Sequence, residues 1–252
     1  MKNLKQIIKE EYQKILQEQN QLQKALRIRK VHGHLKCSNN NLTSLEGAPS
    51  SVGGDFVCYN NNLISLKGAP SSIGGDFDCS SNYHLTSLEG APSSVGGSFY
   101  CQFNNLTSLE GAPSSVDSDF YCNNNKLTSL KGAPSSVDSD FYCNNNKLTS
   151  LEGAPTSVGG DFDCTHNELT SLEGAPSSVG NHFDCCENNL TSLEGAPNSV
   201  AGDFYCAKNN LTSLEGAPNS VGRFDCSNQK NGVEFTEEDV KEVSNVEGKI
   251  WT

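Results

Sequence analysis

Apolar and polar residues alternate along this chain in a pattern that returns about every twenty-one residues. Within each copy a Phe and a Cys, one residue apart, alternate with polar neighbours, which is typical of a strand with one side facing a core. A Leu-Thr-Ser-Leu segment, a Gly-Ala-Pro run and a Val complete the copy. Because one copy is too short to bury its own apolar side chains, the pattern predicts copies that stack on one another.

Ten cysteines mark the copies, and successive ones stand 20 to 22 residues apart. This spacing predicts ten stacked turns over residues 31–230, with a one-residue insertion at Tyr83-His84. An Asn follows three residues after the Cys in nine of the turns, and its amide can satisfy backbone groups where the chain bends. The ten cysteines are Cys37, Cys58, Cys79, Cys101, Cys122, Cys143, Cys164, Cys185, Cys206 and Cys226.

The run Phe-x-Cys-x-x-Asn-x-Leu, followed by Thr-Ser-Leu and Gly-Ala-Pro, resembles the leucine-rich repeat in its short bacterial form. The phrase LTSLEGAPSSVGG is also similar to repeats in uncharacterised bacteriophage proteins. The chain departs from the family in carrying Phe and Cys where Leu is commonest. The resemblance implies a repeat solenoid, a leucine-rich-repeat-like right-handed coil with one parallel β-sheet of about ten short strands and little helix except at the two ends. It also implies a protein-binding scaffold.

The two ends lack the repeat and are predicted to be helical. Residues 1–30 form a basic amphipathic segment without Gly or Pro, and residues 231–252 a C-terminal cap whose short helix begins at Thr236 as N-cap. Atypical units cover the last layers of a solenoid, so both ends are interpreted first as caps. The apolar stripe of the first helix comprises Leu4, Ile7, Ile8, Tyr12, Ile15 and Leu16.

Charge is divided unequally between these parts. Residues 1–36 carry nine Lys and Arg against three Glu, a net charge of +6, and the rest of the chain carries −18. A basic helix beside an acidic array suits a cap held by attraction. It also suits docking on a partner protein, on another copy of the chain or, least favoured, on a membrane surface. Direct binding of nucleic acid is not expected.

The cysteine column predicts a ladder of buried, reduced thiols that pack as small apolar side chains. Stacked strands hold these side chains farther apart than an unstrained disulfide allows, and a straight column does not converge on a tetrahedral metal. We therefore expect a reducing compartment and neither a metal nor a cofactor. Cys186 follows Cys185, so alternation turns it outward as the one thiol expected to be accessible.

The residues that alternate with Phe and Cys are predicted to form the outer surface of the sheet. Three consecutive turns carry Tyr there, flanked by Asp and by a row of amides. Tyr supplies rigid contact area, and carboxylates favour a basic or Arg-rich partner. A second interpretation is that the tyrosines only support neighbouring strands. The predicted partner-binding residues are Tyr100, Tyr121, Tyr142, Asp119, Asp140, Asn123 and Asn144.

Catalysis has little support, because no histidine has a nucleophile or carboxylate at a fixed spacing and the paired carboxylates lie on a flat sheet. We expect a non-enzymatic, phage-encoded protein–protein interaction scaffold. The alternatives are a virion component (a decoration or adhesion protein) anchored by the basic helix, and an acidic nucleic-acid mimic that inhibits a DNA-binding protein. Lacking a signal-peptide core or a membrane-length apolar stretch, the chain is expected in the host cytoplasm or the virus particle.

Overall fold

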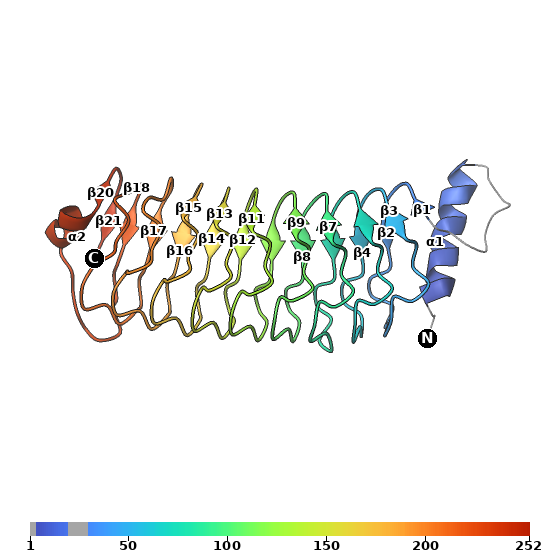
Figure 1. Cartoon of the computed structure of the whole chain (residues 1–252), viewed down its shortest axis with the longest axis horizontal. Coiled ribbons are helices and arrows are strands. Elements are labelled where there is room, and N and C mark those ends of the chain that lie inside the picture. The colour runs from blue at the N-terminus through green and yellow to red at the C-terminus, as the bar shows by residue number, and fades with distance from the viewer. Residues whose placement is uncertain (1–3, 20–29) are drawn as a thin grey trace.

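The chain forms a leucine-rich-repeat-like solenoid, seen lengthwise in Figure 1, and the predicted fold class is confirmed. The computed structural model describes residues 4–19 and 30–252, and the side chains of the first helix as far as residue 13. A main parallel sheet of eleven strands runs along the stack. Its strands are β2 (Leu35–Lys36), β4 (Phe56–Val57), β6 (Phe77–Asp78), β8 (Phe99–Tyr100), β10 (Phe120–Tyr121), β12 (Phe141–Tyr142), β14 (Phe162–Asp163), β16 (Phe183–Asp184), β17 (Phe204–Tyr205), β19 (Phe224–Asp225) and β21 (Ile250–Trp251).

A second row of strands accompanies the main sheet, in addition to the single sheet that was expected. It is built from the dipeptide that ends in the core Val of each turn, and it divides into sheets of five, three and two strands. The strands are β1 (Lys30–Val31), β3 (Ser51–Val52), β5 (Ser72–Ile73), β7 (Ser94–Val95) and β9 (Ser115–Val116), then β11 (Ser136–Val137), β13 (Ser157–Val158) and β15 (Ser178–Val179), then β18 (Ser220–Val221) and β20 (Asn245–Val246).

The core is a set of parallel columns, each made of one residue type. Strands pair in register, so Phe120 lies beside Phe99 on one side and Phe141 on the other. The Phe rings of successive turns have centroids 5.2–5.7 Å apart. The ten repeat cysteines are buried, as expected, together with both leucines of the nine turns that carry a Leu-Thr-Ser-Leu segment or its variant. Each turn therefore packs the same set of core side chains against the turn before it and against the turn after it.

The repeated Asn bonds each turn to the one before it, as its spacing predicted. The Asn61 amide donates to the carbonyl oxygens of Cys58 at 2.9 Å and Cys37 at 3.0 Å, and its Oδ1 accepts the N–H of Leu42 at 2.9 Å. In the tenth turn Gln229 makes the equivalent hydrogen bonds with its longer side chain. It donates to the carbonyl oxygen of Cys226 and accepts the N–H of Leu211 at 3.0 Å. These side chains satisfy buried backbone groups that no strand partner reaches.

The chain bends sharply two residues after each repeat Cys. The residue at that position has a φ between +50° and +58° in every turn, a left-handed conformation that favours Asn and Gly. Five of the ten turns carry Asn there, and the others carry different residue types. The ten residues are Asn39, Asn60, Ser81, Phe103, Asn124, Asn145, His166, Glu187, Lys208 and Asn228.

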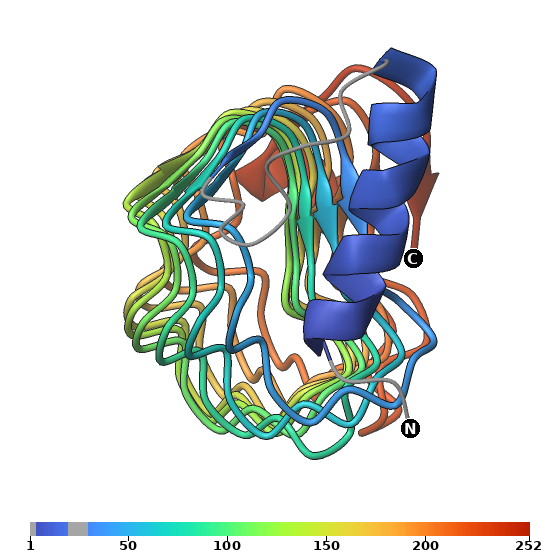
Figure 2. The same cartoon turned by 90° about the vertical axis from the view of Figure 1, so that its right-hand side faces the viewer.

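The first helix, α1 (Leu4–Gln19), packs on β2 at the start of the stack. Figure 2 looks along the solenoid and shows this helix lying across the first turn. Leu4, Ile7 and Ile8 are buried in the core, and Tyr12 is half-buried. The side chains of Ile15 and Leu16, which complete the predicted stripe, lie outside the described residues.

The opposite end is closed by α2 (Glu237–Val243) and by β20 and β21, which pair with the last regular turn. The predicted N-cap is confirmed, because the Thr236 Oγ1 accepts the N–H of Asp239 while the Asp239 carboxylate accepts the N–H of Thr236. Val240 is buried against the last layer.

Candidate functional site

The three predicted tyrosines form one continuous stack on the outer face of the main sheet. Tyr100 and Tyr121 have ring centroids 5.0 Å apart at an interplanar angle of 16°, and Tyr121 and Tyr142 have centroids 4.9 Å apart at 9°. Parallel in-register strands place the rings there, because β8, β10 and β12 each end in Tyr. Each ring is half-buried. We call these three residues the tyrosine row.

The Asp column beside the tyrosine row is part of the framework. The carboxylate Oδ1 of Asp119 accepts the N–H of Asp140 at 3.1 Å, and that of Asp140 accepts the N–H of Asp161 at 2.8 Å. Each carboxylate thus binds the backbone of the next turn, and this charge-assisted bond offsets the repulsion between aligned Asp side chains. Asp119 and Asp140 therefore have a structural role, and their Oδ2 atoms accept the hydroxyls of Ser98 at 3.2 Å and Tyr142 at 3.3 Å.

Four turns carry Asp in place of Tyr at the same outward position, and that Asp bonds to its own turn. The Oδ1 of Asp78 accepts the N–H of Ser80 at 3.0 Å, and that of Asp163 accepts the N–H of Thr165 at 2.9 Å. Burial raises the pKa of both carboxyls above the ordinary value. A turn with Tyr lacks this local acceptor, so its outward side chain is not committed to its own backbone.

Carboxylates surround the end of the row. The Tyr142 Oη lies 3.3 Å from Oδ2 of Asp140 and 3.4 Å from Oδ2 of Asp161. Burial, and then the neighbouring carboxylates, raise the pKa of Tyr121 to about 12 and raise that of Tyr142 further. The phenols are therefore neutral donors at physiological pH.

The predicted amides Asn123 and Asn144 lie next to the row, two residues after Tyr121 and Tyr142. Their Oδ1 atoms, like Oε1 of Gln102, are buried and have no hydrogen-bond partner within the described part of the chain. The structure thus brings all seven predicted site residues onto one strip of the sheet.

Two histidines take the place of Asp in the carboxylate column. The Nδ1 atom of His182 lies 2.9 Å from the backbone nitrogen of Asp203 and 3.5 Å from its Oδ2. Since the shorter contact makes Nδ1 an acceptor, the ring replaces the missing carboxylate and is not an ion-pair donor. His34 differs, because its Nδ1 lies 3.0 Å from the backbone nitrogen of Asp55 and 2.9 Å from Asp55 Oδ2. These contacts are structural and assign no catalytic role to either ring.

Cys186 differs from its expected state. It faces outward as predicted, but it is only half-buried rather than fully accessible, and its N–H donates to Asp184 Oδ1 at 2.9 Å. Burial and the Asp184 carboxylate raise the pKa of its thiol. The alternation rule gave the direction of the side chain correctly but did not include the shielding by neighbouring side chains on the same face.

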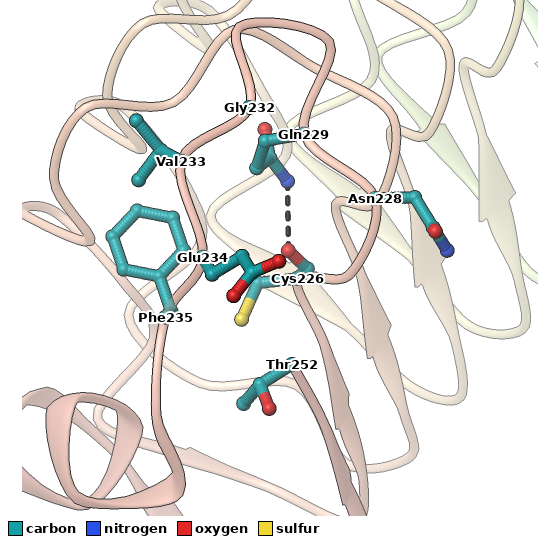
Figure 3. Close-up of a pocket in the computed structure, with 8 residues that line it drawn as sticks. All are labelled: Cys226, Asn228, Gln229, Gly232, Val233, Glu234, Phe235 and Thr252. Atoms are coloured by element: carbon teal, nitrogen blue, oxygen red, sulfur yellow. Dashed lines mark hydrogen bonds between the residues drawn. The ribbon is translucent and has the colours of Figure 1, made fainter.

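A pocket of about 370 Å³ lies at the C-terminal end of the stack (Figure 3). Gln229 donates to the carbonyl oxygen of Cys226 at its wall, and burial raises the pKa of the Cys226 thiol to about 12. The register of β21 on β19 aligns Thr252 with Cys226, so the pocket occupies the layer that a further turn would fill. Its lining is Cys226, Asn228, Gln229, Gly232, Val233, Glu234, Phe235 and Thr252.

The described segments hold no group of three or more His, Cys, Asp or Glu side chains placed to bind a metal ion. No helix within residues 4–19 or 30–252 combines the length and the apolar character that a membrane span requires.

Sequence reasoning missed two residues of the carboxylate column. Asp161, the next Asp after Asp140 in that column, contacts Tyr142. Arg223 stands in the same column in the last turn, with Nη1 3.7 Å from Oδ2 of Asp203. Its place directly before Phe224 was a usable signal, since the nine earlier turns have Asp, Ser or His there.

Comparison with known proteins yields one similar structure. No family model matches the chain, and no similar sequence was found among curated proteins. YopM from Yersinia enterocolitica WA-314 is similar with a TM-score of 0.43 and 19% identity, over 88% of this chain and 69% of that one. A likeness at this level says nothing about function. The bacteriophage origin, the location in cytoplasm or virion, and the virion and nucleic-acid-mimic alternatives stay predictions.

Proposed function

We propose that this chain is a non-enzymatic scaffold that binds a partner protein through the tyrosine row. The observation that carries the proposal is the stack itself, with rings 4.9–5.0 Å apart on an outward face of the solenoid. Tyrosine adds large, rigid contact area at little cost in side-chain entropy, which suits an interface. The Asp side chains at the same position in other turns are hydrogen-bonded to their own backbone. The three tyrosines differ from these Asp residues in lacking that bond and in having a larger side chain.

The surroundings of the row favour a basic partner. Asp119 and Asp140 each use Oδ1 for the next turn, and their Oδ2 atoms accept the hydroxyls of Ser98 and Tyr142 respectively. Asn123 and Asn144 extend the strip with amides. Complementary charge steers encounter and selects partners more than it adds affinity, so we expect association that weakens as salt is raised.

Substitution by the residue that the chain already uses in other turns tests the proposal. Tyr121→Asp converts the turn to the Phe-Asp-Cys form found at Cys79, Cys164 and Cys185, and Tyr205→Asp makes the same change outside the row. A photo-cross-linking amino acid placed at Asn123 reports capture of a partner in cells. We expect the cross-linked protein to be lost with Tyr121→Asp and kept with Tyr205→Asp. Equal capture by both variants would contradict a role for the row.

A further inference from the structure

Tyr142 has one hydroxyl proton but contacts two carboxylates. Its Oη lies 3.3 Å from Oδ2 of Asp140 and 3.4 Å from Oδ2 of Asp161. A phenol can donate only one hydrogen bond, so one of the two contacts brings oxygens together with no proton between them. The Oδ1 atoms of both carboxylates already accept backbone N–H groups, and that of Asp161 also accepts the Asn181 side-chain amide at 2.7 Å, so the two Oδ2 atoms share the one phenol proton. The cluster of Asp140, Tyr142 and Asp161 is therefore short of a donor.

The chain itself shows how a related cluster is completed. In a later turn the Tyr205 Oη donates to Oδ2 of Asp203 at 2.7 Å. Arg223 follows in the next turn, and its Nη1 lies 3.7 Å from the same Asp203 oxygen. Arg223 takes the column position that Asp161 takes beside Tyr142, since each directly precedes the Phe of its strand. The solenoid therefore places an arginine beside one Tyr–Asp pair and a second carboxylate beside the other.

We infer that the Asp140–Tyr142–Asp161 cluster receives an arginine side chain of a partner protein. The inference deepens the proposed function and rests on it. Within residues 4–19 and 30–252, no Lys, Arg or His forms an ion pair with Asp140 or Asp161. A guanidinium has five donors in a planar fork and can reach both carboxylates and the phenol oxygen together, whereas an ammonium is a compact point charge. The two carboxylates disfavour any phosphate-bearing ligand.

Paired peptide probes test this assignment on the intact chain. Two fluorescein-labelled peptides of one Gly-Ser-rich sequence carry either two arginines or two lysines, and fluorescence anisotropy measures their binding at low and high salt. We expect the arginine peptide to bind about tenfold more tightly than the lysine peptide, which corresponds to about 1.4 kcal/mol. Asp161→Asn should remove that difference, and its amide oxygen can still accept the N–H of His182, so the backbone bond is kept.

Arg223→Gln gives an independent arm, because it vacates the arginine position beside Tyr205. Because the vacated position has one carboxylate, Asp203, and not the two that define the cluster, we expect this variant to keep the single arginine-selective site of the natural chain. Circular dichroism confirms that each variant is folded. Equal binding of the two peptides, or arginine preference that survives Asp161→Asn, would overturn the inference. Either result would leave the cross-linking test of the tyrosine row standing, so the two failures are distinguishable.

The source of the arginine is decided by sedimentation velocity. The sequence has three arginines, of which Arg27 and Arg29 belong to the basic N-terminal segment. A salt-sensitive dimer that is lost on joint Arg27→Gln and Arg29→Gln substitution would show that the arginine comes from a second copy of this chain. A chain that stays monomeric yet prefers the arginine peptide supports a different protein as the source.

Discussion

The side-chain amide of Asn146 joins two turns, donating to the carbonyl oxygen of Cys143 at 3.0 Å and to that of Cys122 at 3.1 Å. Its Oδ1 accepts the N–H of Leu127 at 3.0 Å. Asn146→Ala leaves the buried N–H of Leu127 without its acceptor, whereas the two Cys carbonyls each keep one donor, from Asn125 and Asn167. We therefore expect a loss of about 1–3 kcal/mol in the free energy of unfolding. Urea denaturation followed by circular dichroism measures it.

Asn144 supplies the matched control for that prediction. It is the same residue type in the same turn, but its Oδ1 has no partner among the described residues. Asn144→Ala should therefore change the free energy of unfolding by less than about 1 kcal/mol. If both variants lost similar stability, the hydrogen bonds of Asn146 would not be what holds the turns together.

Phe103 occupies a left-handed position, with φ of 55°, where five other turns carry Asn. Its ring is 46% exposed, so packing gains little from it. Asn adopts this conformation more readily than Phe, and we expect Phe103→Asn to stabilise the fold by about 0.5–1 kcal/mol. Thermal unfolding measures the change. Phe103→Ala is the control, because it removes the ring without gaining the Asn preference and should not reproduce the stabilisation.

The repeat cysteines should resist modification in the native molecule. Thiol reagents attack the thiolate, and burial raises the pKa of the Cys37 thiol to about 12 and that of the interior cysteines still further. We expect peptide-resolved mass spectrometry after brief alkylation at pH 8 to show little labelling of these ten positions until urea unfolds the chain. The pKa of Cys186 is raised as well, but it is the only half-buried thiol among the described cysteines, so reagent access should make it react first. Rapid labelling of most of the ten in the folded state would contradict the buried ladder.

The architecture was predictable because each position of the repeat has the same surroundings in every turn. Phe, Cys, Asn and the paired leucines recur at fixed spacing, and one consistent reading of the spacing places all of them inside. The Ser-Val strands were not predicted, since a two-residue bridge around one Val has no alternation to detect.

The site was harder to predict than the fold, because its chemistry depends on contacts between turns. The sequence shows Asp119 and Asp140 as a row of like charges, but only the structure shows each Oδ1 accepting the next turn's N–H. Likewise, the link between Tyr142 and Asp161 crosses to the following turn and depends on side-chain conformation. Periodicity gives the column in which a residue lies and not the atoms that it contacts.

Asp163 makes a prediction about pH. Burial raises its pKa above the ordinary value in the folded state, so the folded chain binds the proton more readily than the unfolded chain. The wild-type free energy of unfolding therefore falls as pH rises from about 4, the unfolded pKa, and the cost is fully present once pH exceeds the raised folded pKa. Asp163→Asn keeps an oxygen that can accept the N–H of Thr165 and removes the buried charge. We expect this variant to be more stable than wild type at pH 7, with the advantage shrinking as pH falls toward 4 and below.

Urea denaturation at several pH values measures this advantage. Glu168→Gln, an exposed carboxylate-to-amide change in the same turn, is the control. An advantage that stayed constant with pH would show that removal of the buried charge is not its cause.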